Sequence, residues 1–423
     1  MPRRFGAPVA PGAWDLFFIA AIVVGAALRC AWLSDMEYKG DERWTFDRTQ
    51  RIPALEPWPS VGMMSSVGMV NPGLSVWAFV ALAKAFAVRS PLGLAAAVVS
   101  CNVAAFAILY AFVVRGVARE EREPWLWGLA LAAVNPVALV LERKIWTPCL
   151  FPIFSVAFLV GWLRRSTRWG AASWGLVGAL LGQIQMSGFF YAAAFAFAEL
   201  TVGRVRAARP KTRWLAWLIG TALGALPMLP WVPVAWAQRG RAPPVALARV
   251  LDLRWLRGWV SDTLGLSLDY SLGPDYADFL RHPLFWTGDL YPALYLQGAS
   301  FAIGAYVVAC SVGAWLAVRP SSTRLLSALR RVREAQFTAA VAFGGFGLLM
   351  TAAVRVIYRH YNAVTFPLEW VALALLALAY APSPRQWLAC LWGVQLALSL
   401  TFLAYIHEHH GAAGDYGRAF HWQ

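Results

Sequence analysis

Apolar blocks of about twenty residues, separated by short polar linkers, make up most of the chain. A helix of that length spans the ~30 Å hydrocarbon core of a bilayer. About eleven blocks fit, and we predict that each crosses a membrane: roughly 14–33, 91–114, 125–141, 148–163, 169–185, 187–202, 214–236, 296–318, 336–354, 362–380 and 387–406. The pattern predicts a single-domain, all-α polytopic membrane protein over residues 1–423.

One further apolar block, residues 72–88, decides the predicted topology. It has only seventeen residues and contains Lys84. If it crossed the membrane, the linkers "RRSTR" and "RVRAARPKTR" would lie outside, whereas a surface position puts both, and "RPSSTRLLSALRRVR", inside. Because Lys and Arg near span ends favour the cytoplasmic side, we predict an interfacial helix on the outer surface. The outer face then carries a first loop at 34–90, a long loop at 237–295 and the C-terminal tail.

The long loop contains a helical pattern with two possible positions. Val250, Leu251, Trp255 and Trp259 recur at helical spacing. This helix either lies along the outer leaflet or is an ordinary buried helix, and the spacing does not separate the two.

The C-terminal tail reads "HEHHGAAGDYGRAFHWQ". Its first four residues, His407, Glu408, His409 and His410, fit a metal site only loosely, and a solvated tail is the simpler interpretation. The aromatic end of the tail could instead fold back over the outer face.

Composition supports the membrane assignment and narrows the class of partner. Hydrophobic residues make up 59% of the chain and charged residues 14%, whereas soluble domains carry about 25% charged residues. The first apolar block follows "MPRR" without a small-residue cleavage site, so we expect a retained helix. A net charge of +15 then indicates contact with anionic lipid headgroups and not with nucleic acid. The five cysteines lack CxxC spacing, which argues against disulfides or a cysteine metal site.

The charged segment "SDMEYKGDERWTFDRTQR" at 34–51 directly follows the first block. In one interpretation it is helix architecture, with Asp41 as N-cap and Glu42 as a first-turn acid. In the other, Asp41 is a general base at the mouth of the helix bundle. Adjacent helical residues diverge by about 100°, so one carboxylate would face a cavity while the other holds a loop or a divalent cation. The remaining acids are expected to be solvated loop charges: Asp35, Glu37, Asp47 and Glu56.

Two other predicted outer turns are rich in cations. "LERKIWTP" supplies Arg143 and Lys144, and "RVIYRHYNAVTFP" supplies a second group: Arg355, Arg359, His360 and Tyr361. Arg can hold phosphate oxygens in a planar fork and Lys acts as a point charge. These turns could bind a phosphate, or their side chains could simply reach the lipid headgroups.

With "GDE" in the first outer loop, "NPGLSVW" opening a juxtamembrane helix and "RHYNAVTFPL" before a late span, the chain resembles the GT-C superfamily of membrane glycosyltransferases. It is most similar to the bacterial branch related to protein O-mannosyltransferases and aminoarabinose transferases. The similarity covers nearly the whole chain. It implies a GT-C-type bundle with outer-face juxtamembrane helices, in the bacterial inner membrane with the active site on the periplasmic side.

The resemblance also implies an activity and a set of site residues. The expected reaction transfers a sugar from a polyprenyl-phosphate donor, with inversion, to a hydroxyl or amine of a glycan, lipid or protein. Asp41 matches the catalytic aspartate, and Arg359 or Tyr361 matches residues near the donor phosphate. The other expected substrate-binding residues are Glu42, Arg143, Lys144, Arg355 and His360. Asn71 replaces the histidine of the family's "HPP" stretch, and Glu142 is followed by two cations, so the acceptor and any divalent cation stay open.

Three other functions are compatible with the sequence. A transporter or flippase for lipid-linked glycans would place ionisable residues near the midplane, where Arg29 and Lys84 are partial exceptions in an otherwise uncharged set. An O-antigen ligase or polymerase would use arginines of the long loop: Arg239, Arg241, Arg249, Arg254, Arg257 and Arg281. A non-catalytic assembly partner would lack a cavity joining Asp41 to Arg359.

Overall fold

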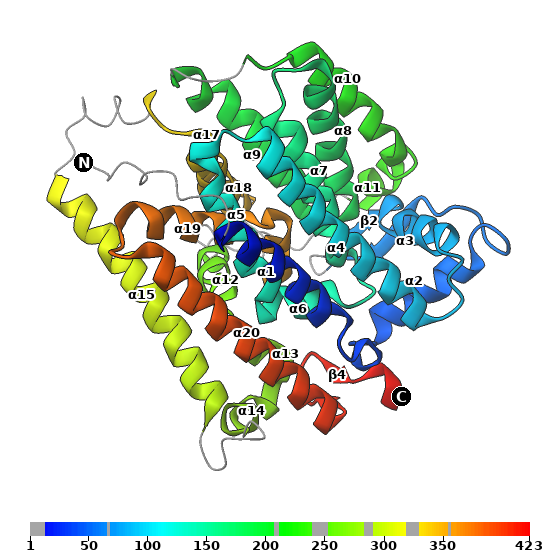
Figure 1. Cartoon of the computed structure of the whole chain (residues 1–423). Coiled ribbons are helices and arrows are strands. Elements are labelled where there is room, and N and C mark those ends of the chain that lie inside the picture. Colours follow the sequence, from blue (N-terminus) through cyan, green and yellow to red (C-terminus); the bar gives the residue numbers. More distant parts are fainter. Residues whose placement is uncertain are drawn as a thin grey trace.

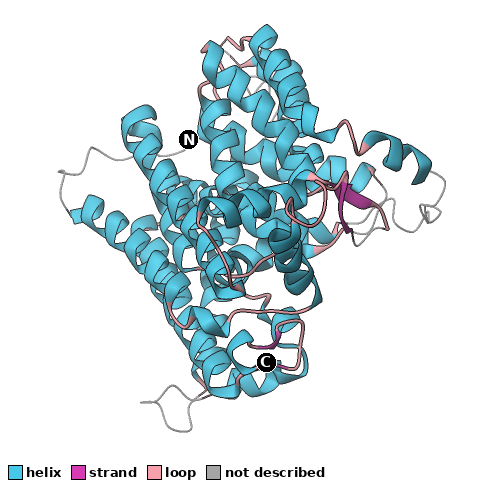
Figure 2. Cartoon of the chain, turned by 90° about the vertical axis from the view of Figure 1, so that its right-hand side faces the viewer, coloured by secondary structure: helices cyan, strands magenta, loops and turns pink. Residues whose placement is uncertain are grey.

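The computed structural model describes residues 13–65, 68–206, 211–238, 253–282, 291–318, 330–353 and 357–423, and these are mostly helical (Figure 1). Two short hairpins supply the strands, as Figure 2 shows: β1 (Val61–Met64) with β2 (Val70–Pro72), and β3 (Gly411–Ala412) with β4 (Gly417–Arg418). The prediction of an all-α polytopic membrane protein agrees with this architecture.

Five helical segments in the described part of the chain are long and apolar enough to cross a membrane, or up to eight if three bent helix pairs each count as one span. The predicted eleven spans therefore exceed the number seen. The five contain α4 (Pro91–Gly116), α9 (Ser187–Leu200), α15 (Pro292–Val318), α17 (Glu334–Ala340) continuing into α18 (Phe346–Ala352), and α20 (Pro384–His409). A π-helical turn, Val341–Gly345, joins α17 to α18.

The bundle has two closely packed groups of helices. In one, α5 (Arg119–Val134) packs against α1 (Ala13–Cys30), α19 (Leu368–Tyr380) and α20, and α15 lies beside α20 (Figure 1). In the other, α8 (Arg168–Ile184) packs against α7 (Phe151–Leu163), α9 and α10 (Trp214–Ala225), and α10 is followed along the chain by α11 (Val232–Gln238). A Cβ on Gly220 would lie 2.0 Å from the Ala172 carbonyl, so small residues set the close contact between α8 and α10.

The predicted span at 125–141 is broken by a proline. Pro136 disfavours helical backbone at Asn135, and α5 ends at Val134. The Asn135 side chain then accepts hydrogen bonds from the amides of Val137 and Ala138, both at 3.0 Å, and caps α6 (Pro136–Glu142). The two helices meet at 68°. This bend carries the chain after Glu142 across the end of the bundle.

At one end of the bundle the basic linkers come together. Arg165 forms ion pairs with Glu199 at 3.4 Å and with Glu334 at 2.7 Å, and Arg206 pairs with Glu334 at 2.9 Å. The linkers at 164–168 and 203–206 and the start of α17 therefore lie on the same side of the bundle.

Short helices gather at the opposite end. They are α2 (Gly40–Arg51), α3 (Leu74–Ala85), α12 (Arg254–Thr263), α13 (Leu268–Leu272) and α14 (Tyr276–Arg281). The twelve residues of α3 extend about 18 Å, too little to cross ~30 Å of hydrocarbon. In α12, Trp255 and Trp259 are buried and pack on Phe343, whereas Leu256 and Val260 are exposed, so the described part of this segment is buried on one face only. Val250 and Leu251 lie outside the described residues.

The C-terminal tail folds back onto the loop that follows α1. Helix α20 continues to His409, and the chain then reverses through β3 and β4. Ala419 pairs with Glu37 in a β-bridge, and the Tyr416 hydroxyl donates to the Asp35 carbonyl at 2.6 Å. The aromatic end of the tail therefore folds back, whereas Glu408, His409 and His410 stay exposed, as the solvated interpretation expects for them.

A buried ion pair joins the first helix to α6. Arg29 Nε lies 2.6 Å from Glu142 Oε2, and its Nη1 donates to the carbonyls of Gly25 and Ala133.

Removing one partner of this ion pair leaves the other charge buried. We expect Glu142→Ala to destabilise the fold by about 3–5 kcal/mol, and Arg29→Met with Glu142→Met to recover part of that loss. Thermal unfolding of the purified variants measures both changes in stability. An equal loss of stability in the single and double variants would show that the unpaired buried charge is not the cause of the loss.

Candidate functional site

The loop after α1 leads directly into a capped helix. Lys39 is the N-cap of α2, and Glu42 at the third helical position accepts a hydrogen bond from the Lys39 amide at 2.9 Å. The prediction that Asp41 would be the N-cap is therefore wrong, because the cap lies two residues earlier. Asp41 therefore lies in the first turn of α2, where the helix dipole favours a negative charge.

The neighbouring acids Asp41 and Glu42 have different environments. Glu42 is buried, and burial raises the pKa of its carboxyl although nearby Lys144 opposes the shift. Asp41 is exposed to the cavity, and its carboxylate has no hydrogen-bond or ion-pair partner among the described residues. Glu42 therefore holds the loop through the Lys39 amide, but the expectation that only one of the two acids faces the cavity is wrong, because both lie on its lining.

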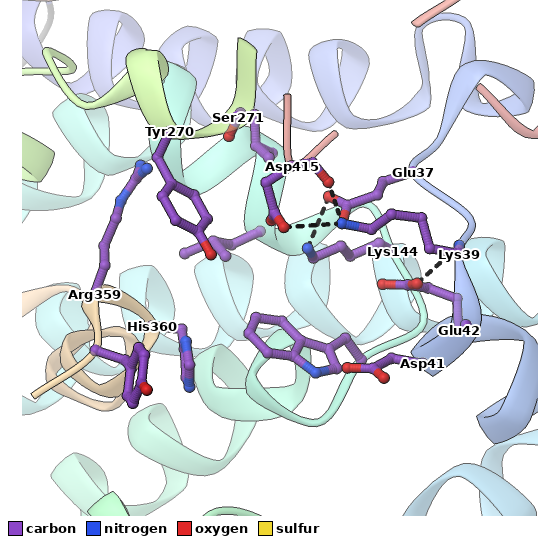
Figure 3. A pocket seen from close by; sticks show the side chains of 15 residues that line it. Glu37, Lys39, Asp41, Glu42, Lys144, Tyr270, Ser271, Arg359, His360 and Asp415 are labelled. Carbon is purple, nitrogen blue, oxygen red and sulfur yellow. Dashed lines mark hydrogen bonds and ion pairs between the residues drawn. The ribbon is translucent and has the colours of Figure 1, made fainter. Parts of the chain in front are cut away.

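Both acids line a cavity of about 350 Å³ at this end of the bundle (Figure 3). Five separate parts of the chain meet there: the loop and first turn of α2, the end of α6 with the turn after it, α13, the segment at 358–360, and the C-terminal tail. The lining residues are Glu37, Lys39, Gly40, Asp41, Glu42, Val140, Leu141, Lys144, Trp146, Tyr270, Ser271, Tyr358, Arg359, His360 and Asp415.

Glu37 organises one wall of the cavity. One oxygen lies 2.8 Å from Lys39 Nζ and the other 2.8 Å from Lys144 Nζ. Burial opposes the charge on Lys144, but Glu37 and Glu42 outweigh it and raise the lysine pKa above its ordinary value. The expectation that Asp35 and Glu37 are solvated is wrong, since both are buried by the folded-back tail.

The tail contributes Asp415, which sequence reasoning did not single out. Its Oδ1 lies 3.1 Å from Lys39 Nζ, and its backbone carbonyl also accepts from that ammonium group. Tyr270 and Ser271 of α13 lie beside it on the lining. The only local sign in the sequence is a pair of glycines around "DY", typical of a turn, which does not reveal what the turn contacts.

In Figure 3, Arg359 and His360 lie on one side of the cavity, and Asp41 and Glu42 lie on the other side. Arg359 Nε lies 3.0 Å from Asp262 of α12, and its Nη1 donates to the Ser267 carbonyl. Burial raises the pKa of the Asp262 carboxyl, with Arg359 opposing the shift. The His360 ring meets the Trp146 indole edge-on with centroids 4.7 Å apart.

Two other predicted residues, Arg143 and Tyr361, are not on the cavity lining. Arg143 turns away and donates through Nη2 to the carbonyls of Ala31 and Trp32, which ties α6 to the end of α1. Tyr361 is buried behind His360, with ring centroids 4.6 Å apart. Arg355 lies outside the described residues. Arg143 is thus better explained as a structural residue than as a substrate ligand.

The charges on the lining nearly balance. Four carboxylates, Glu37, Asp41, Glu42 and Asp415, face the cations Lys39, Lys144 and Arg359. A group of three or more His, Cys, Asp or Glu residues with their potential metal-ligand atoms within 4.8 Å of one another occurs, among the described residues, around His282 and not at this cavity.

The Glu37–Lys144 ion pair also bears on topology. Between these two residues the chain contains α4 and the bent pair of α5 and α6, each a candidate span. Two crossings return the chain to the same side, and a third crossing by α3 would separate the partners. The contact therefore supports a surface position for α3.

The chain matches no protein-family model and no curated protein sequence. Among solved structures it is similar to the Archaeoglobus fulgidus oligosaccharyltransferase in its apo form, with a TM-score of 0.44 and 14% identity. The superposition covers 94% of this chain and 56% of that protein, so the chain spans just over half the length of its structural neighbour.

Glu37 is the residue whose loss should destabilise the cavity wall most. Glu37→Gln leaves Lys144 buried without its closest counter-charge, and we expect a loss of about 3–5 kcal/mol in the free energy of unfolding. Asp415→Asn, which breaks only the half-exposed pair with Lys39, should cost less than about 1 kcal/mol. Thermal unfolding distinguishes the two, and a larger loss in Asp415→Asn would overturn this ranking.

Proposed function

We propose that the chain is a membrane glycosyltransferase that transfers a sugar from a polyprenyl-phosphate donor to an acceptor hydroxyl or amine, with inversion. The observation that supports this most is the cavity in which the unpartnered carboxylate of Asp41 shares a lining with Lys144, Arg359 and His360. A free acid and a set of cations in one cavity are what this transfer needs. The acid activates the nucleophile and the cations receive the phosphate.

In the proposed reaction, Asp41 accepts the proton of the acceptor hydroxyl or amine as that group attacks the anomeric carbon. The bond between the anomeric carbon and the phosphate oxygen breaks, and the lipid phosphate leaves with the bonding electrons. Because a phosphate leaves as an anion, no general acid is required. Attack from the face opposite the leaving group inverts the anomeric centre.

Arg359 is the best candidate for holding the phosphate. Asp262 and the Ser267 carbonyl fix its Nε and Nη1, so the guanidinium is already oriented when a ligand arrives. Nη2 has no protein partner in the described part of the chain. Lys144 would contribute positive charge from the other side of the cavity, held in place by Glu37.

Aromatic residues give the cavity surfaces suited to a sugar ring. Trp146, Tyr270 and Tyr358 lie on the lining, and the Trp146 ring also carries Lys144 Nζ at 4.6 Å from its centroid. Aromatic rings present an apolar face together with a polar edge or hydroxyl. We propose that they pack on the C–H face of the transferred sugar while the charged groups act on the phosphate and the acceptor.

The alternatives receive less support. The assembly-partner hypothesis predicts no cavity joining Asp41 to Arg359, yet both line the same one. For the ligase hypothesis, Arg254, Arg257 and Arg281 are absent from the cavity lining, and the other loop arginines fall outside the described residues. A flippase would use charges within the bilayer, where the buried Arg29–Glu142 pair is already neutralised.

We place the active site on the periplasmic side of a bacterial inner membrane, following the positive-inside count.

The role of Asp41 is tested by Asp41→Asn, which keeps the shape of the side chain and removes the base. We expect sugar transfer to fall about 10²–10⁴-fold while stability drops by no more than about 1 kcal/mol, because the Asp41 carboxylate has no recorded partner and only the helix dipole favours its charge. Asp47→Asn, an exposed acid on the same helix, is the matched control and should keep full activity. Transfer of a polyprenyl-phosphate sugar by the purified variants is the measurement, and wild-type transfer by Asp41→Asn would exclude the base assignment.

Arg359 is tested by donor binding. Arg359→Lys keeps the charge but loses the planar fork, so we expect weaker binding, and Arg359→Ala should bind more weakly still. Since Arg359→Ala also leaves Asp262 unpaired, the double variant with Asp262→Ala separates a folding defect from a binding defect. Arg257→Lys, an exposed arginine on α12, is the control. Unchanged binding of a polyprenyl-phosphate sugar in the folded double variant would rule out Arg359 as the phosphate ligand.

A further inference from the structure

A second group of chemically active side chains lies where the C-terminal tail leaves α20. His282, at the end of α14, meets Glu408 and His409, in the last turn of α20, and the potential ligand atoms of these three residues all lie within 4.8 Å of one another. Among the described residues it is the one group of this kind. None of the three lines the cavity described above.

The distances within this group suit a metal ion. His282 Nε2 lies 3.2 Å from Glu408 Oε2. Two ligands of one tetrahedral zinc ion, each about 2.0–2.1 Å from the metal, are about 3.3 Å apart. A carboxylate of α14, Asp278 Oδ2, lies 3.8 Å from His409 Nε2 and can act as a fourth ligand after a small movement.

One hydrogen bond sets the tautomer of His409. His409 Nδ1 lies 2.9 Å from the Tyr405 carbonyl, which can only accept, so Nδ1 carries the proton. In the neutral ring the Nε2 lone pair then faces Asp278, another acceptor. Two acceptors that face each other repel unless a proton or a metal ion lies between them.

Tyr405 supports the group as an outer shell. Its ring stacks on His409 at 4.0 Å between centroids and meets His282 edge-on at 5.2 Å. Its hydroxyl donates to Asp278 Oδ2 at 3.0 Å. Such second contacts to histidine and carboxylate ligands are usual around protein-bound metals and fix the ligand geometry.

We infer that His282, Glu408 and His409, with Asp278 as a fourth ligand, form a zinc-binding site that ties α14 to the end of α20. Two imidazoles with carboxylates are borderline ligands of the kind zinc prefers. The site would hold the point from which the tail departs, and that tail carries Asp415 to the cavity wall. The role is structural and does not depend on the proposed transferase activity.

The test is metal binding by the purified full-length chain, stripped with a chelator and titrated with Zn²⁺ alone. We expect one tight site per chain, and a four-coordinate visible absorption spectrum when Co²⁺ replaces zinc. His282→Ala and Glu408→Gln should lose that site, and Tyr405→Phe should weaken it about tenfold. His421→Ala removes a tail histidine outside the group and should bind as wild type does.

Two results would overturn the inference. One is an absence of tight zinc binding by the wild-type chain, which would leave ring packing and hydrogen bonds as the link between α14 and α20. The other is equal zinc binding by wild type and Glu408→Gln. Glu408→Gln keeps the size of the side chain, so it decides the question even if His282→Ala fails to fold. A rise in the unfolding temperature on adding Zn²⁺, present in His421→Ala and lost in Glu408→Gln, would support the structural role.

Discussion

The contact between Glu37 and Lys144 determines how the candidate site is assembled. A lysine and a glutamate this deeply buried are tolerated only as partners, because each alone would cost several kcal/mol. Their pairing joins the loop after the first helix to the turn after α6, which are more than a hundred residues apart. Asp41 follows Glu37 by four residues and Trp146 follows Lys144 by two, so this one contact brings the acid and an aromatic wall of the cavity together.

That contact depends in turn on breaks in two membrane helices. Asn135 and Pro136 end α5 and start α6 at a steep angle, which brings Lys144 over the end of the bundle. A second bend of 70° separates Arg359–Thr365 from α19 and leaves Arg359 and His360 at the same end. Irregular backbone at membrane depth is tolerated where it is buried in protein or lines a cavity. The broken helices are therefore an expected accompaniment of a site built into a helix bundle.

The tail closes the site from the far end of the chain. Tyr416 and Ala419 bury Asp35 and Glu37, and Asp415 adds a carboxylate beside Lys39. His407 strengthens the same junction, with Nδ1 2.7 Å from Asp35 Oδ2 and its ring stacked on Trp32. A change in the last few residues is consequently a change in the cavity wall, although nothing in the local composition of the tail indicates it.

The sequence by itself determined the membrane class, the helical architecture and the short helix at 74–85, since these follow from block length and apolar content. It also pointed to Asp41, Lys144, Arg359 and His360, because charges at the ends of apolar blocks are few and conspicuous. Only the tertiary structure decided which charges are buried, that Arg143 faces the end of α1, and that Asp415 reaches the cavity. The physical reason is that hydropathy and spacing describe each helix alone. The partners of a buried charge lie on distant segments, and packing brings them together.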